Sequence, residues 1–193
     1  MKYEVEMKFP VADLAALESR LAATGTEIRP PQLELDVYFA HPSRDFAVTD
    51  EALRIRRKGH LNFLTYKGPK IDATTKTRRE IDLPLPNDEE SAQAWSGLLE
   101  ALGFAPVAEV LKSRRKFRID WQNQKVEGTL DHVEQLGDYA ELELVVAPDG
   151  LDKARTCIAS LAETLGLRGS ERRSYLELLT DSVDRSQQDR SRS

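Results

Sequence analysis

Two acidic pairs are the residues of this sequence best suited to chemistry, because a single residue separates the carboxylates in each pair. They are Glu4 with Glu6 near the start of the chain, and Glu141 with Glu143 near its end. In an extended strand, alternate side chains point to one face, so Glu4 and Glu6 would lie roughly 7 Å apart at Cα, at about 3.3 Å per residue. Carboxylates at this spacing suit one or two hard divalent cations such as Mg²⁺.

Basic residues show the same alternation elsewhere in the chain. Arg54 and Arg56 flank one apolar residue, and Lys112 and Arg114 share one parity. A guanidinium group makes paired, charge-assisted hydrogen bonds to phosphate oxygens, and a lysine adds a point charge. Acidic strands that hold a metal, facing cationic strands, describe a polyphosphate site, since phosphoryl chemistry needs mainly positioning and charge neutralisation.

Other chemistries find little support in the sequence. It contains no Walker pattern and no G-x-G-x-x-G. His41, His60 and His132 show no ligand spacing, and with the single cysteine Cys157 we expect no zinc site of the usual kind. His132 follows Asp131 and is interpreted as an outward-facing strand residue rather than a catalytic base.

The composition predicts one cytoplasmic domain. The chain has 193 residues, a formal net charge of -5 and 40% hydrophobic residues, which suits a single domain with a proper core. No apolar run approaches the ~20 residues of a membrane span, and strand-like alternation starts at once instead of a signal peptide. A lone cysteine fits a reducing compartment. The acidic balance argues against nucleic-acid binding, so we expect neither a nucleic-acid nor a membrane partner.

Periodicity predicts the elements that position these side chains. Helices are expected from about Val11 to Thr24, from the turn at Asp88 to Gly103, and from Gly150 to Gly166, with a short fourth helix at Tyr175 to Leu179. Alternating segments predict about eight strands. These are 2–9, 33–39, 52–57, 62–67, 78–84, 109–119, 126–133 and 139–146. The segment 181–193 has one apolar residue and is predicted to be a disordered tail after a domain at 1–180.

The signs of charge segregate between strands, whereas a solvated face would mix them along each strand. Eight strands can close into a barrel, which removes exposed edges. We therefore expect an α+β fold in which a closed barrel turns its charged faces inward and carries its helices outside. An ordinary β-sandwich with charged outer faces is the plain alternative.

A series of motifs, in order over about residues 1–180, resembles the CYTH superfamily, the triphosphate tunnel metalloenzymes. The N-terminal Glu4-x-Glu6-x-Lys8 resembles the family signature, and the closing Ser174-Tyr175-Leu176-Glu177-Leu178-Leu179 resembles the class IV adenylyl cyclase-like branch. The motifs between them are Asp36-Val37-Tyr38-Phe39, Ala52-Leu53-Arg54-Ile55-Arg56, Tyr66-Lys67-Gly68-Pro69, Arg78-Arg79-Glu80, Lys112-Ser113-Arg114, Leu130-Asp131-His132-Val133 and Leu136-Gly137-Asp138-Tyr139-Ala140-Glu141-Leu142-Glu143.

The resemblance implies a closed, antiparallel, eight-stranded tunnel, a small molecule bearing a triphosphate as substrate, and Mg²⁺ or Mn²⁺ as cofactor. By motif position it implies catalytic roles for Lys8, Lys67 and Arg114. The implied metal ligands are Glu4, Glu6, Glu141 and Glu143, with Glu80 and Asp131 contributing directly or through water. The implied substrate-binding residues are Lys8, Tyr38, Arg54, Arg56, Lys67, Lys112 and Arg114. For Tyr38, packing at the mouth of the tunnel is the alternative to substrate contact.

The family divides by reaction. Its cyclases let the ribose 3'-hydroxyl attack the α-phosphorus of ATP, and its hydrolases direct an activated water at the terminal phosphate of thiamine, nucleoside or inorganic triphosphate. Bacterial class IV cyclases carry a His-Phe pair before the acidic strand, and this sequence begins at Met1-Lys2-Tyr3. Hydrolysis is therefore the favoured prediction, and cyclisation of ATP to cyclic AMP is the alternative. A non-catalytic polyphosphate-binding module is a second alternative, and we expect a monomer or a homodimer.

Overall fold

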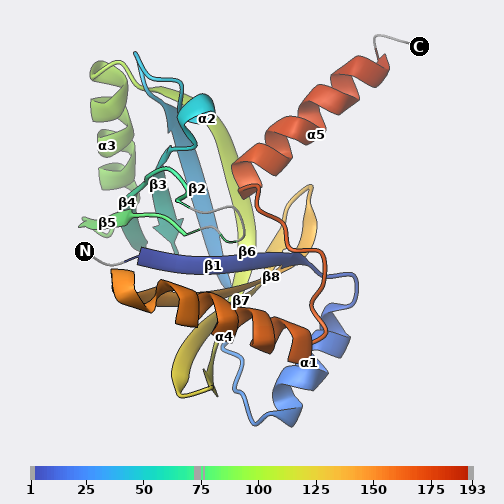
Figure 1. Cartoon of the computed structure of the whole chain (residues 1–193). Helices are drawn as coiled ribbons and strands as arrows, with labels where there is room; N and C mark the ends of the chain where they lie inside the picture. The colour runs from blue at the N-terminus through green and yellow to red at the C-terminus, as the bar shows by residue number, and fades with distance from the viewer. Residues whose placement is uncertain (1–2, 72–74, 76, 191–193) are drawn as a thin grey trace.

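The computed structural model describes residues 3–71, 75 and 77–190, with side chains as far as Ser182. It contains one antiparallel sheet of eight strands, as predicted (Figure 1). In the order β1-β8-β7-β6-β2-β3-β4-β5, each strand pairs with its neighbour. The strands are β1 (Tyr3–Pro10), β2 (Gln32–Ala40), β3 (Ala52–Lys58), β4 (Leu61–Lys67), β5 (Glu80–Leu85), β6 (Ala105–Trp121), β7 (Gln124–Val133) and β8 (Gly137–Val146).

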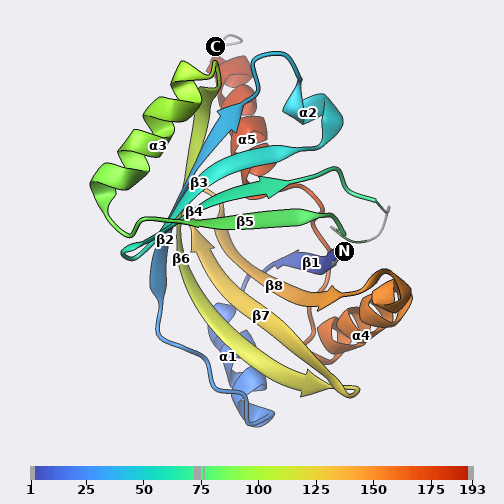
Figure 2. The same ribbon diagram turned by 90° about the vertical axis from the view of Figure 1, so that its left-hand side faces the viewer.

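The prediction of a closed barrel is wrong, because the sheet is curled but open. Its edges are β1 and β5, which approach each other without forming a ladder (Figure 2). Among the described residues, the backbone link across this gap is one bridge, in which Glu4 and Arg78 exchange hydrogen bonds of 3.4 and 3.3 Å. Pro84 lies within β5 and has no N–H to donate to a second neighbour, which suits β5 to an edge.

Helices form where the sequence predicts them. They are α1 (Leu14–Ala23), α3 (Glu89–Ala101) and α4 (Leu151–Thr164), the last preceded by a 3-10 turn at Pro148–Gly150. The carboxylates of Asp13 and Asp88 cap α1 and α3 by accepting from backbone N–H groups at 2.9 and 2.5 Å. None of the helices in the described part of the chain has the length and apolar content to cross a bilayer.

Two helical segments differ from the prediction. A short helix, α2 (Phe46–Thr49), follows Asp45, whose carboxylate accepts from the N–H groups of Ala47 and Val48. The final helix, α5, spans Tyr175–Arg190 and so includes most of the segment for which we expected disorder. Arg173 pairs with Asp181 at 2.8 Å and ties the second turn of α5 to the segment before it. Residues 191–193 lie outside the described residues.

The apolar faces of the strands pack under α1, α3 and α4, which leaves the charged faces on the concave side of the sheet. Val5 and Leu142 join Ile158 of α4 in the largest cluster, beside α1. Ile55 packs with Leu99 of α3 in another. A third cluster lies on the concave side, where Tyr175 and Leu178 of α5 pack on Val110, Val133 and Tyr139. Val110 and Tyr139 share strand parity with the cavity-lining Lys112 and Glu141, so the start of α5 covers one end of the charged face rather than its back. The charged residues of these strands line one cavity on the concave side, as the predicted inward direction of the charged rows requires.

Candidate active site

The concave face of the sheet lines a large cavity of about 1240 Å³. Most of the predicted site residues meet there, although they come from seven different strands. Its walls include Glu4, Glu6, Tyr38, Arg54, Arg56, Lys67, Glu80, Lys112, Arg114, Glu141 and Glu143. The remaining two predicted residues, Lys8 and Asp131, are absent from the lining. The ionic rows thus share one pocket rather than meeting solvent separately.

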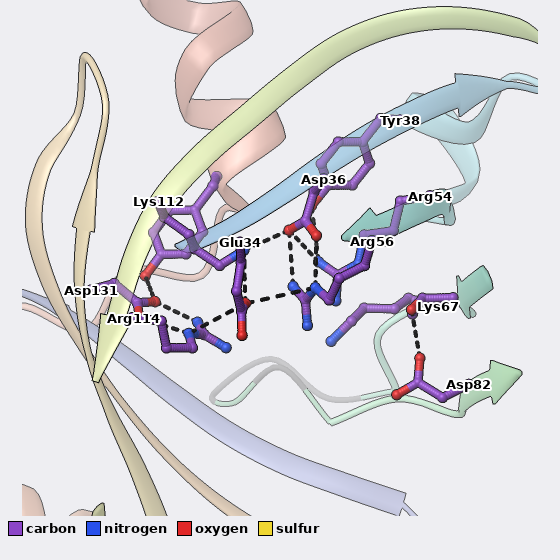
Figure 3. Close-up of polar contacts among 12 residues, drawn as sticks. Glu34, Asp36, Tyr38, Arg54, Arg56, Lys67, Asp82, Lys112, Arg114 and Asp131 are labelled. Carbon is purple, nitrogen blue, oxygen red and sulfur yellow. Dashed lines mark hydrogen bonds and ion pairs between the residues drawn. The ribbon is translucent and has the colours of Figure 1, made fainter. Parts of the chain in front are cut away.

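Three cations on one wall converge on the buried carboxylate of Asp36 (Figure 3). Arg56 donates to it through Nε and Nη2 at 2.6 and 2.9 Å, Lys112 through Nζ at 2.6 Å, and Arg54 through Nη1 at 3.2 Å. Burial acts to raise the pKa of Asp36, but Arg54, Arg56 and Lys112 outweigh it and hold the pKa well below its usual value. We call Arg54, Arg56, Lys112 and Arg114 the cationic wall.

Glu34 extends this support along β2. Its Oε2 lies 3.4 Å from Lys112 Nζ, 3.8 Å from Arg56 Nε and 3.9 Å from Arg114 Nε. Strand β2 lies between β3 and β6 in the sheet, so its carboxylates reach cations on both neighbours. Glu34 and Asp36 are absent from the predicted site residues. Their signal is present in the sequence, since Glu34, Asp36 and Tyr38 alternate with apolar residues.

Three carboxyl groups and one ammonium group form a cluster beside β1. Lys67 Nζ lies 3.3 Å from Glu4 Oε2 and 2.7 Å from Glu80 Oε2. The Glu4 carboxyl group is also within hydrogen-bonding reach of Glu80 and Glu143. Burial raises the pKa of Glu4 well above its usual value against the opposing charge of Lys67, and burial also raises the pKa of Glu143. We call Glu4, Glu80 and Glu143 the acidic cluster.

Strand register adds a second concentration of negative charge. Glu143 on β8 pairs with Glu6 on β1 and with Glu127 on β7, and all three line the cavity. Like charges directly opposite one another destabilise a sheet. Arg118 pairs with Glu127 at the outer end of this row. A row of this kind is suited to binding a cation.

The acidic side chains fit the metal that the family resemblance implies, although they do not form a finished centre. Among the described residues, no three Asp, Glu, His or Cys side chains are already arranged to hold a metal ion. The donors are carboxylate oxygens, which Mg²⁺ and Mn²⁺ prefer. Moreover, Glu4 and Glu80 already hold a cation in the ammonium group of Lys67. Glu4, Glu6, Glu80 and Glu143 would hold the metal, with Glu141 beside them on β8.

Lys8 and Asp131 instead anchor the start of α5. Lys8 is fully buried, donates from Nζ to the carbonyl oxygen of Arg173 at 2.6 Å, and lies 4.0 Å above the ring of Tyr175. Asp131 accepts from Tyr175 Oη at 2.8 Å and from both Nε and Nη2 of Arg114. Both residues thus lie on the concave side beneath Arg173 and Tyr175, which line the cavity in their place, and their roles as ligands stay predictions.

An open, curled sheet with a cationic wall and acidic rows around one cavity is a charge arrangement suited to polyanions together with cations. The CYTH domain model matches residues 2–175. A curated protein of Methanocaldococcus jannaschii, named "Putative adenylate cyclase", is 35% identical over 178 residues, covering 91% of this chain and 97% of that protein. Adenylate cyclase CyaB of Aeromonas hydrophila is 29% identical over 188 residues, covering 94% and 91%.

A solved structure of a Pyrococcus horikoshii protein has a TM-score of 0.81 and 40% identity, covering 93% of this chain and 99% of that one. Both the family match and these similarities extend over nearly the whole domain. The chain belongs to the CYTH family.

Proposed function

We propose that this protein is a metal-dependent CYTH enzyme that acts on an organic triphosphate, with hydrolysis of the terminal phosphate as the first candidate reaction. The observation that carries the proposal is the presence of both charge types in one cavity. Arg54, Arg56 and Lys112 face it from one side, and Glu6 and Glu143 face it from the other. Enzymes of this kind are triphosphatases or class IV adenylate cyclases.

The cationic wall is already organised for phosphate oxygens. Asp36 and Glu34 fix the guanidinium groups of Arg54 and Arg56 before any ligand arrives, so little reorganisation accompanies binding. Preorganised donors of this sort contribute about 3 kcal/mol each to transition-state stabilisation. A divalent cation at the acidic side chains would supply further charge neutralisation and a more acidic water. Arg114, held by Asp131, extends the wall toward β7.

The size and lining of the cavity support an organic substrate over inorganic triphosphate. At about 1240 Å³ the cavity exceeds the roughly 300–1,000 Å³ of ordinary small-molecule pockets. One part of its lining is apolar and comes from α2, β6 and α5, through Phe46, Ala47, Val107 and Leu176. Hydrolysis needs phosphate binding, a metal and water, and the described side chains supply suitable groups for the first two.

Cyclisation of ATP to cyclic AMP and pyrophosphate is the second candidate. The names of the two curated relatives favour it, and one of them is 35% identical to this chain. This reaction additionally requires the ribose 3'-hydroxyl to be held in line with the α-phosphorus. No side chain is assigned to that task.

A substrate panel with product identification tests the proposal. ATP, thiamine triphosphate and tripolyphosphate are each incubated with Mg²⁺ or Mn²⁺. Inorganic phosphate as the product supports hydrolysis, cyclic AMP with pyrophosphate supports cyclisation, and binding without any product refutes an enzyme and favours the binding module. Glu6→Gln should lower turnover at least about tenfold, since even residues behind metal ligands cost 10–100-fold. The matched control is Glu163→Gln on the exposed face of α4, which should leave turnover unchanged.

A further inference from the structure

Lys67 lies among the carboxylates that fit a metal ion, although its motif position predicts phosphate binding. Its ammonium group contacts Glu4 at 3.3 Å and Glu80 at 2.7 Å. The three side chains are 19, 12 and 18% exposed, so water contributes little to their solvation. This lysine also joins β4 to β1 across the gap between the sheet edges.

A divalent cation bound to the same carboxylates would displace Lys67. Two positive groups cannot share the oxygens of Glu4 and Glu80 without strong repulsion at this depth. The displaced ammonium group would then need another anion, because a mostly buried ammonium without a partner is costly. Metal binding alone therefore carries a penalty that originates in this chain's own lysine.

The phosphate-binding side of the cavity is where that anion would be. In the register between β3 and β4, Thr65 pairs with Arg54 and Lys67 pairs with Ala52, so Arg54 and Lys67 occupy adjacent positions of the lining. A phosphate group held by Arg54 would lie within the neighbourhood of the Lys67 side chain. Lys67 thus stands between the acidic cluster and the cationic wall and has a partner available on either side.

We propose that Lys67 is an internal counterion, which holds the acidic cluster when no metal is bound and transfers to the substrate's phosphates when metal and triphosphate bind together. The inference deepens the proposed function and rests on it. Its consequence is that the metal alone binds weakly. A triphosphate strengthens metal binding in two ways. Its oxygens coordinate the metal directly, and its phosphates also pair with the displaced ammonium group of Lys67.

The decisive measurement is Mn²⁺ affinity without any phosphate, determined by isothermal titration calorimetry at pH 8. Lys67→Met removes the competing cation and should bind Mn²⁺ more tightly than the wild type, by roughly 5–150-fold, the usual range for coupled sites. Direct coordination of metal by phosphate predicts no such gain, since no phosphate is present. Lys67→Arg keeps the charge and should retain weak binding. The matched control is Lys153→Met, because Lys153 is exposed on α4 and is absent from the cavity lining.

The outcomes separate this inference from the proposed function. Equal or weaker Mn²⁺ affinity in a folded Lys67→Met protein overturns the counterion role, even if the wild type turns over triphosphates. Tighter Mn²⁺ binding without turnover of any substrate refutes the proposed function and leaves the counterion role standing. Circular dichroism establishes folding, and Lys67→Gln, which can still hydrogen-bond to the carboxylates, replaces the methionine variant if that one does not fold.

Discussion

Replacing Asp36 by Asn should destabilise the fold and make its stability depend on polyanions. Asp36 accepts four hydrogen bonds from Arg54, Arg56 and Lys112. The amide keeps the shape of the side chain but leaves the buried Arg54 and Lys112 and the part-buried Arg56 without their shared countercharge. Breaking a buried ion pair by removing one partner costs about 3–5 kcal/mol. For a domain of this size, each kcal/mol lowers Tm by about 2–4 °C, so the expected loss is roughly 6–20 °C.

A polyanion should restore much of this loss. Tripolyphosphate would place oxygens beside Arg54, Arg56 and Lys112 and replace the missing charge, so it should raise the Tm of Asp36→Asn more than that of the wild type. Thermal unfolding followed by circular dichroism, with and without tripolyphosphate, measures both effects. The control is Asp152→Asn, because Asp152 is 97% exposed and a surface substitution of this kind changes stability by about 0.5 kcal/mol or less.

Two results would refute this reasoning about Asp36. One is a Tm for Asp36→Asn within about 2 °C of the wild-type value, which would mean that the cations find other partners at little cost. The other is a large loss that tripolyphosphate restores no better than it stabilises the wild type. That result would place the three cations out of reach of a phosphate in the cavity.

The remaining predictions concern the cationic wall and the start of α5. Arg56→Ala should lower kcat/KM for a triphosphate by roughly 3 kcal/mol, about 150-fold, and a change of only a few-fold would contradict its phosphate role. Burial, then the charge of Arg56, lowers the pKa of Lys112 to about 8, so its positive charge is lost as pH rises through that value. The affinity for tripolyphosphate, measured by calorimetry, should therefore fall above pH 8 in the wild type but not in Lys112→Arg, whose charge persists. The same decline in both proteins would show that loss of charge on Lys112 is not its cause. Tyr175→Phe removes a hydrogen bond of 2.8 Å to Asp131 and should cost about 1.5–3 kcal/mol in urea unfolding, whereas an unchanged midpoint would show that this bond does not anchor α5. In the pH prediction for Lys112, the charged groups that face its ammonium group are Glu34 and Asp36 on β2, Arg54 and Arg56 on β3, and Arg114 on β6.

Local periodicity is sufficient to predict the elements and the direction of most side chains. Alternation with a period of two identifies strands such as β3, because Arg54 and Arg56 face the cavity while Leu53 and Ile55 contribute to the core between sheet and helix. Helix ends follow from local signals too, including the caps at Asp13 and Asp88.

Features that depend on long-range pairing are harder to obtain from the sequence. The opposition of Glu6, Glu143 and Glu127 requires the register of three strands, two of them far from β1 in the chain. Closure of the barrel also depends on which strands become edges, and alternation is the same in an edge strand as in a central one. The proline in β5, Pro84, is a local sign of an edge.

Lys8 and Asp131 show a third limit. Their parity places them with cavity-facing residues, yet both bind the segment that enters α5. Lys8 donates a hydrogen bond to the carbonyl oxygen of Arg173, and Asp131 accepts one from the hydroxyl group of Tyr175. Parity gives the side of a strand on which a residue lies, whereas the partner of a long side chain depends on which segment of the chain covers that end of the strand.

The contact between Lys8 and Arg173 has a consequence for biosynthesis. Its two residues are 165 positions apart, so the ribosome needs roughly 8–33 s at 5–20 residues per second to deliver the second partner after the first. Until β8 has been synthesised, β1 also lacks the strand with which it pairs in the folded sheet. Charges that interrupt an apolar strand disfavour its aggregation, and Glu4, Glu6 and Lys8 alternate with the apolar residues of β1.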